Sequence, residues 1–159
     1  MRVLGVDFGL RRVGLALSDP AGSMAFPLKT VQRTEKDGRE ALFAELAGVV
    51  ASEFVEMVVV GWPAPAEGRD SLTARQAANF AASLARRVAV PVKLMDETLS
   101  SEEALDDLRA AGLKASKRKG VLDQQAAVRI LQSYLDDPQA ARDVAAQWRP
   151  QTPDPARNS

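Results

Sequence analysis

The sequence of 159 residues contains no cysteine and no histidine. Without cysteine the chain cannot form disulfides, use a thiol nucleophile, or hold iron–sulfur clusters or zinc through thiolates. Without histidine it cannot use a Ser-His-Asp triad, a histidine general base, or the usual zinc and non-haem iron sites. A metal site in this chain must therefore be built from oxygen ligands, which suits Mg²⁺ or Mn²⁺.

Long apolar runs are also missing. No run approaches the ~20 apolar residues of a membrane span, and no charged and apolar signal-type segment opens the sequence. Apolar residues make up 46% and charged residues 26%, as in ordinary globular domains, and the length suits one domain with its own core. We therefore expect a soluble, cytoplasmic protein with no membrane association.

Net charge of one sign is absent as well, because 21 basic residues balance 21 acidic ones. This balance argues against binding nucleic acid through bulk charge, but not against a local basic patch. Residues 99–107 carry four acids, whereas residues 109–119 carry five basic side chains and no acid. A run such as Lys117, Arg118 and Lys119 is ordinarily a solvated loop, and beside a metal site it suits phosphate contacts.

The first third of the chain indicates three strands. Residues 2–8 and 13–18 are apolar and β-branched, and the short turn from Gly9 to Arg12 predicts a hairpin. Residues 25–31 continue the pattern, but Pro27 restricts that segment to an edge or bulged strand. Links this short exclude parallel pairing, so the three strands are expected to be antiparallel.

The rest of the chain alternates helices and short strands. Apolar spacing predicts helices near residues 37–54, 71–88, 100–112 and 120–135, and strands near residues 57–60 and 91–95. This order predicts an α/β fold, with a mixed five-stranded sheet and helices on both faces. Residues 1–137 would form the domain, and the proline-rich residues 138–159 a C-terminal tail that is partly disordered.

Three carboxylates stand at the ends of predicted strands. Asp7 ends the first strand, and Asp96 and Glu97 end the 91–95 strand, where α/β sheets place their ligand sites. Ordinary explanations exist, because Asp7 could open the turn and the other two could lie before a helix N-terminus. Position at a strand end does not choose between Asp96 and Glu97.

Asp123 is a fourth candidate. It shares a helix face with Ala127, Ile130 and Tyr134, which points it toward the core side. A first-turn acid gains ~0.3–1 kcal/mol from the helix dipole, whereas burying a lone charge costs several kcal/mol. A divalent cation would balance that charge, and converging carboxylates are the expected ligands for Mg²⁺.

Four segments resemble the YqgF/RuvX family: VDFGLRRVGLALSD (6–19), VVVGWP (58–63), DETLSS (96–101) and KRKGVLDQQAAVRILQSYL (117–135). Members of that family are Holliday-junction resolvases and nucleases that trim the precursor of 16S rRNA. The resemblance implies an RNase H-like fold and an acidic metal site made of Asp7, Glu97 and Asp123. One departure is the segment Trp62–Gly68, which lacks the family's polar loop residues and places Glu67 at the family's Asp position.

The resulting expectation is a metal-dependent nuclease acting on structured RNA or branched DNA, either free or within pre-ribosomal particles. The three acids would be catalytic and would hold two Mg²⁺ or Mn²⁺ ions. Phosphates would be bound by the turn and the basic run, namely Gly9, Arg11, Arg12, Lys117, Arg118 and Lys119.

Two other functions remain open. One is a non-catalytic RNA-binding or ribosome-binding factor on the same fold. The other is an ATP-handling domain of the actin and sugar-kinase type, whose phosphate hairpin also begins Asp-x-Gly. Those proteins need two such domains, and this chain has one. The sequence leaves the choice of RNA or DNA, and of monomer or homodimer, undecided.

Overall fold

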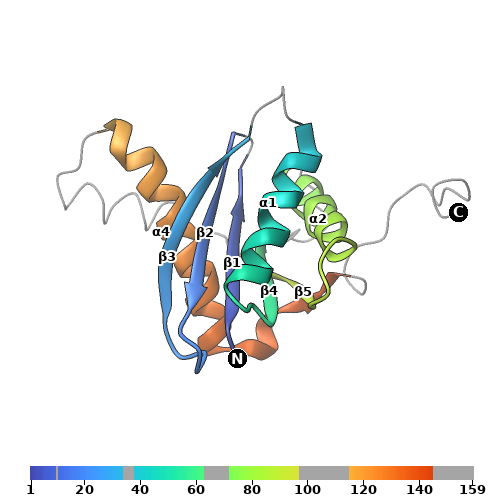
Figure 1. Cartoon of the computed structure of the whole chain (residues 1–159). Helices are drawn as coiled ribbons and strands as arrows, with labels where there is room; N and C mark the ends of the chain where they lie inside the picture. The colour runs from blue at the N-terminus through green and yellow to red at the C-terminus, as the bar shows by residue number, and fades with distance from the viewer. Residues whose placement is uncertain (10, 34–37, 63–71, 97–114, 145–159) are drawn as a thin grey trace, which may run out of the picture.

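The computed structural model describes residues 1–9, 11–33, 38–62, 72–96 and 115–144, with backbone only for residues 72–73 and 115–123. Within these ranges the chain forms one layered α/β unit (Figure 1). Its elements are β1 (Val3–Phe8), β2 (Arg12–Ser18), β3 (Ala25–Gln32), α1 (Gly38–Ser52), β4 (Met57–Trp62), α2 (Leu72–Ala85), β5 (Val92–Asp96), α4 (Ala115–Asp136), the 3₁₀ turn η1 (Pro138–Ala140) and β6 (Arg142–Asp143).

The six strands form one mixed sheet in the order β3-β2-β1-β4-β5-β6. The first three strands pair antiparallel, and β1, β4 and β5 pair parallel. This arrangement confirms the predicted fold class, with one strand more than expected. The extra strand is β6, which pairs antiparallel with β5.

The first hairpin and the sheet edge also match the sequence. Phe8 pairs with Val13, and the backbone N–H of Gly9 donates to the carbonyl oxygen of Arg12 at 3.0 Å to close the turn. Strand β3 lies at the sheet edge, and its register with β2 shifts beside Pro27. Proline lacks the N–H that an inner strand needs, so the edge is where it is tolerated.

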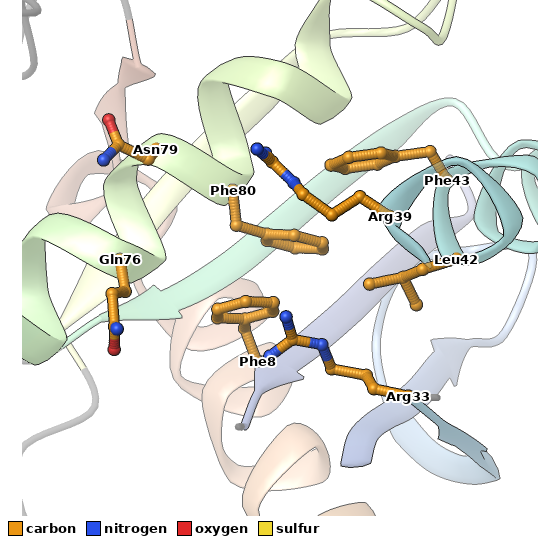
Figure 2. A pocket seen from close by; sticks show the side chains of 8 residues that line it. All are labelled: Phe8, Arg33, Arg39, Leu42, Phe43, Gln76, Asn79 and Phe80. Carbon is orange, nitrogen blue, oxygen red and sulfur yellow. The ribbon is translucent and has the colours of Figure 1, made fainter. Parts of the chain in front are cut away.

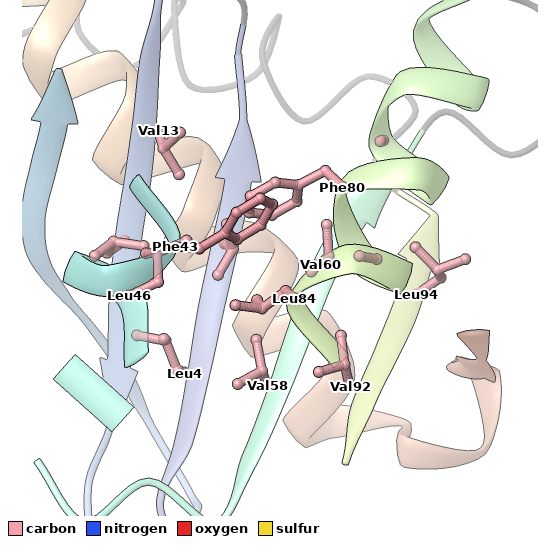
Figure 3. Packing of buried hydrophobic residues seen from close by; sticks show 14 of the residues in the cluster. Leu4, Val13, Phe43, Leu46, Val58, Val60, Phe80, Leu84, Val92 and Leu94 are labelled. Carbon is pink, nitrogen blue, oxygen red and sulfur yellow. The ribbon is translucent and has the colours of Figure 1, made fainter. Parts of the chain in front are cut away.

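Helices cover both faces of the sheet (Figure 1), with α1 and α2 on one face and α4 on the other. Figure 3 shows the larger core, where Phe43 and Leu46 of α1 and Phe80 and Leu84 of α2 pack over the sheet. On the opposite face α4 lies directly on β1. A Cβ placed on Gly5 would stand 2.7 Å from the Cβ of Leu131.

One predicted boundary is wrong. The sequence predicts a basic loop over residues 109–119 and a helix beginning near Gly120, but α4 begins at Ala115, and residues 109–114 lie outside the described ones. Residues 117–119 are therefore helical. Lysine, arginine and alanine favour helix, and a glycine inside a helix costs only about 1 kcal/mol, so the first turns extend past Gly120. The helix expected at residues 100–112 lies outside the described residues.

The chain continues on the sheet beyond residue 137. The turn η1 leads into β6, and Val144 is buried in the larger core. The first seven residues of the expected tail therefore belong to the packed unit, and residues 145–159 lie outside the described ones. Among the helices the structure describes, none is long and apolar enough to cross a lipid bilayer.

Candidate active site

Asp7 lies one residue before the end of β1, paired with Gly14 of β2. Side chains alternate along a strand, so Asp7 projects from the same face as Gly5, and that face is the one α4 covers. The Asp7 side chain is half-buried. The structure thus places an acid at the end of a central strand, under the helix that carries Asp123.

The backbone of α4 reaches the level of Asp7. Gln124 donates through Nε2 to the Oγ1 of Thr30 at 3.1 Å, and Thr30 pairs with Gly14, the partner of Asp7. Thr30, Gly14 and Asp7 therefore form one row across the sheet, and Gln124 is fixed above that row. Asp123 precedes Gln124, so its backbone stands at the same level and on the same face as Asp7.

Asp96 ends β5 on the other face. Val92 and Leu94 pack into the larger core under α2, and Asp96 has the same strand parity. It is exposed and pairs with Trp62 of β4. The structure therefore separates Asp96 from Asp7 by the thickness of the sheet. Glu97 lies outside the described residues.

The turn between β1 and β2 carries the predicted phosphate-binding residues. A Cβ on Gly9 would lie 2.6 Å from the carbonyl oxygen of Arg12, so this tight turn requires glycine. Arg11 is exposed and Arg12 is half-buried. The start of α4, with residues 117–119, lies at the same end of the molecule as this turn (Figure 1).

Arg33 is a residue that the sequence analysis missed. Its backbone N–H donates to the carbonyl oxygen of Arg11 at 2.8 Å, and its Nη1 donates to the carbonyl oxygen of Gly9 at 2.8 Å. These bonds fix the turn from the neighbouring strand. A single arginine after a strand carries no recognisable pattern, so only the three-dimensional structure could reveal it.

Solved structures share this architecture. RuvC from Thermus thermophilus aligns with a TM-score of 0.56 at 18% identity, covering 90% of this chain and 99% of RuvC. The T. thermophilus RuvC in complex with a Holliday junction substrate gives a TM-score of 0.55 at 19% identity over the same shares. The chain therefore shares the RNase H-like fold of these structures.

Sequence comparison identifies the family. The family model described as "RuvX: Holliday junction resolvase" matches residues 1–137. A protein of Nitratidesulfovibrio vulgaris (strain Miyazaki F) is 51% identical over 145 residues, covering 91% of this chain and 100% of the relative. A protein of Maridesulfovibrio salexigens is 51% identical over 135 residues, covering 85% of this chain and 98% of the relative. Both carry the name "Putative pre-16S rRNA nuclease". The chain belongs to the RuvX family.

Proposed function

We propose that this protein is a metal-dependent nuclease that hydrolyses phosphodiester bonds in structured nucleic acid. Its substrates would be the 5′ end of pre-16S rRNA, as the relatives' names indicate, and the Holliday junction of the family description. The observation that carries the proposal is the half-buried Asp7 at the end of β1, on the face and at the level of the Asp123 backbone.

Asp7, Glu97 and Asp123 would hold Mg²⁺ or Mn²⁺. All three are carboxylates in a chain without histidine or cysteine, and oxygen donors of this kind suit these ions. Asp96 projects from the face of the sheet opposite to that of Asp7. This favours Glu97, the next residue along the chain, as the ligand. When bound, a pair of such ions would activate the attacking water and stabilise the leaving oxygen.

The protein's own side chains would bind and orient the strand to be cut. Arg11 at the turn is exposed and can bind a backbone phosphate, while Arg33 holds the turn in place. Arg12 and residues 117–119 of α4 would extend this basic surface along the same end of the molecule. Binding through phosphates is independent of sequence and weakens steeply with salt.

The test is the substitution Asp7→Asn, compared with Asp96→Asn. Both remove one carboxylate charge at a strand end, but only Asp7 lies on the α4 face. Cleavage of a pre-16S rRNA 5′-end transcript and of a four-way DNA junction is measured in parallel with Mg²⁺, with Mn²⁺ and with chelator. We expect Asp7→Asn to reduce cleavage to the chelator background, with binding retained, and Asp96→Asn to cleave normally.

Two results would contradict the proposal. Normal cleavage by Asp7→Asn would show that the activity lies elsewhere. Binding of both substrates by the unmodified protein without cleavage under any metal condition would indicate a non-catalytic RNA-binding factor instead.

A further inference from the structure

A cavity of about 250 Å³ lies behind Asp7, on the face of the sheet that α1 and α2 cover. Phe8 lines it, and because Phe8 follows Asp7 in β1, the two side chains project from opposite faces. Arg33, Arg39, Gln76, Asn79 and Phe80 also line it (Figure 2). This cavity is separate from the acidic site but shares the same end of β1.

Stacked rings orient the two arginines of the cavity. Phe8 and Phe80 stack with their ring centroids 4.3 Å apart, and the guanidinium carbon of Arg33 lies 4.6 Å from the Phe8 centroid. The guanidinium carbon of Arg39 lies 5.5 Å from the Phe43 centroid, and its Nη2 donates to the Oγ of Ser83 at 3.2 Å. Cation–π contacts and hydrogen bonds thus hold both guanidinium groups in place without removing their charge.

The lining is positively charged. Among the described residues that line the cavity there are two arginines and no carboxylate. Burial lowers the pKa of Arg33, and the positive charge of nearby Arg39 lowers it further. An anion in the cavity would relieve this repulsion, and the amide groups of Gln76 and Asn79 could donate hydrogen bonds to it.

We infer that this cavity binds a phosphate group of the nucleic-acid strand whose scissile bond lies at Asp7. Arginine binds phosphate through charge-assisted hydrogen bonds, and Arg33 connects the cavity to the phosphate-binding turn through its bond to the carbonyl oxygen of Gly9. A strand that passes around the end of β1 would contact both faces. The inference rests on the proposed function for its ligand, and a free phosphate or mononucleotide would offer the same chemistry.

The experiment uses the full chain in buffer with chelator, so that binding is measured without cleavage. The probes are a labelled single-stranded RNA of ten nucleotides, AMP and inorganic phosphate. Asn79→Asp places a carboxylate at the cavity without changing side-chain size, and Arg39→Gln removes one charge. Both side chains are exposed, and thermal unfolding of each variant checks that it is folded. Arg86→Gln is the matched control, because Arg86 is an exposed arginine next to α2 that does not line the cavity.

We expect each cavity variant to weaken RNA binding about tenfold, Arg39→Gln through one lost charged hydrogen bond and Asn79→Asp through repulsion between its carboxylate and the phosphate. Arg86→Gln should leave RNA binding within about twofold. Loss of AMP or phosphate binding in the two variants, with RNA binding unchanged, would support the cavity but identify a free phosphate as its ligand. Affinities for all three probes equal to those of Arg86→Gln would overturn the inference. Cleavage by these variants is assayed separately, so failure of the cavity and failure of the nuclease assignment give different results.

Discussion

Gly5 controls how closely α4 approaches β1, so replacing it with alanine tests the geometry of the acidic site. The added Cβ would lie 2.7 Å from the Cβ of Leu131 and 3.0 Å from the carbonyl oxygen of Ala127. One is a backbone oxygen of α4 and the other is a Cβ, which is fixed to that backbone, so neither atom can rotate away. The helix itself must move off the strand, and it carries Asp123.

The expected loss of stability follows from overpacking. Inserting one methyl group into a close-packed interior costs typically about 1–3 kcal/mol. For a chain of this length, each kcal/mol lowers the melting temperature by roughly 2–4 °C, so Gly5→Ala should melt about 2–12 °C lower. Displacement of α4 should also reduce cleavage at temperatures where the variant is still fully folded.

Gly48→Ala is the matched control. Gly48 lies in α1, and a Cβ there would meet nothing within 4 Å. The same substitution at this exposed helix position should raise stability by up to ~1 kcal/mol. Urea and thermal unfolding of both variants give the comparison. If Gly48→Ala gains stability while Gly5→Ala unfolds like the original protein, α4 does not contact β1 as closely as described.

Three further predictions concern other parts of the molecule. Alanine at all three residues 117–119 should weaken RNA binding and reduce the slope of log affinity against log salt by up to ~0.7 per lost phosphate contact, and an unchanged slope would contradict their role. Backbone and hydroxyl donors of Met24 and Ser23 lower the pKa of Asp19 from 3.8 to about 2, so its stabilising effect is present above pH 4 and disappears as the pH falls through 2. The difference in urea midpoint between the original protein and Asp19→Asn should shrink over that interval, and a constant difference would refute the assignment. Phe54 has a φ of 55° and is 80% exposed, so Phe54→Gly should raise the unfolding free energy by about 1 kcal/mol, whereas a loss would mean that the ring is packed.

Much of the fold could be predicted from local patterns. Apolar, β-branched segments joined by a short turn indicated the first hairpin, and Pro27 indicated an edge or bulged strand, because both depend on backbone chemistry within a few residues. The start of α4 was missed because Gly120 resembled a boundary, and packing on the sheet outweighs its small helix penalty. Strand β6 was missed because two polar residues, Arg142 and Asp143, show no alternation, and only pairing with β5 makes them a strand.

The candidate site was predictable only in part. Asp7 stood out because an acid directly after an apolar run is unusual, and its place on β1 agrees with a site at that strand end. The sequence could not choose between Asp96 and Glu97. The face of the sheet from which a side chain projects depends on its position along the strand, and the structure gives that position for Asp96. The arginine-lined cavity combines residues from β1, α1, α2 and the residue after β3, and no local pattern unites them.

Strand β6 has a practical consequence for anyone who shortens this chain. It covers the outer edge of β5 by pairing with Lys93 and Leu94. The Nζ of Lys93 also lies 3.8 Å from a carboxylate oxygen of Asp143. Among the described strands only β6 pairs with that edge, so a chain ended at residue 137, where the family match stops, would lose this pairing. Open edges recruit strands from other copies, so such a fragment should self-associate. Self-association measured on such a fragment would be a result of the truncation, so the oligomeric state should be measured on the full chain.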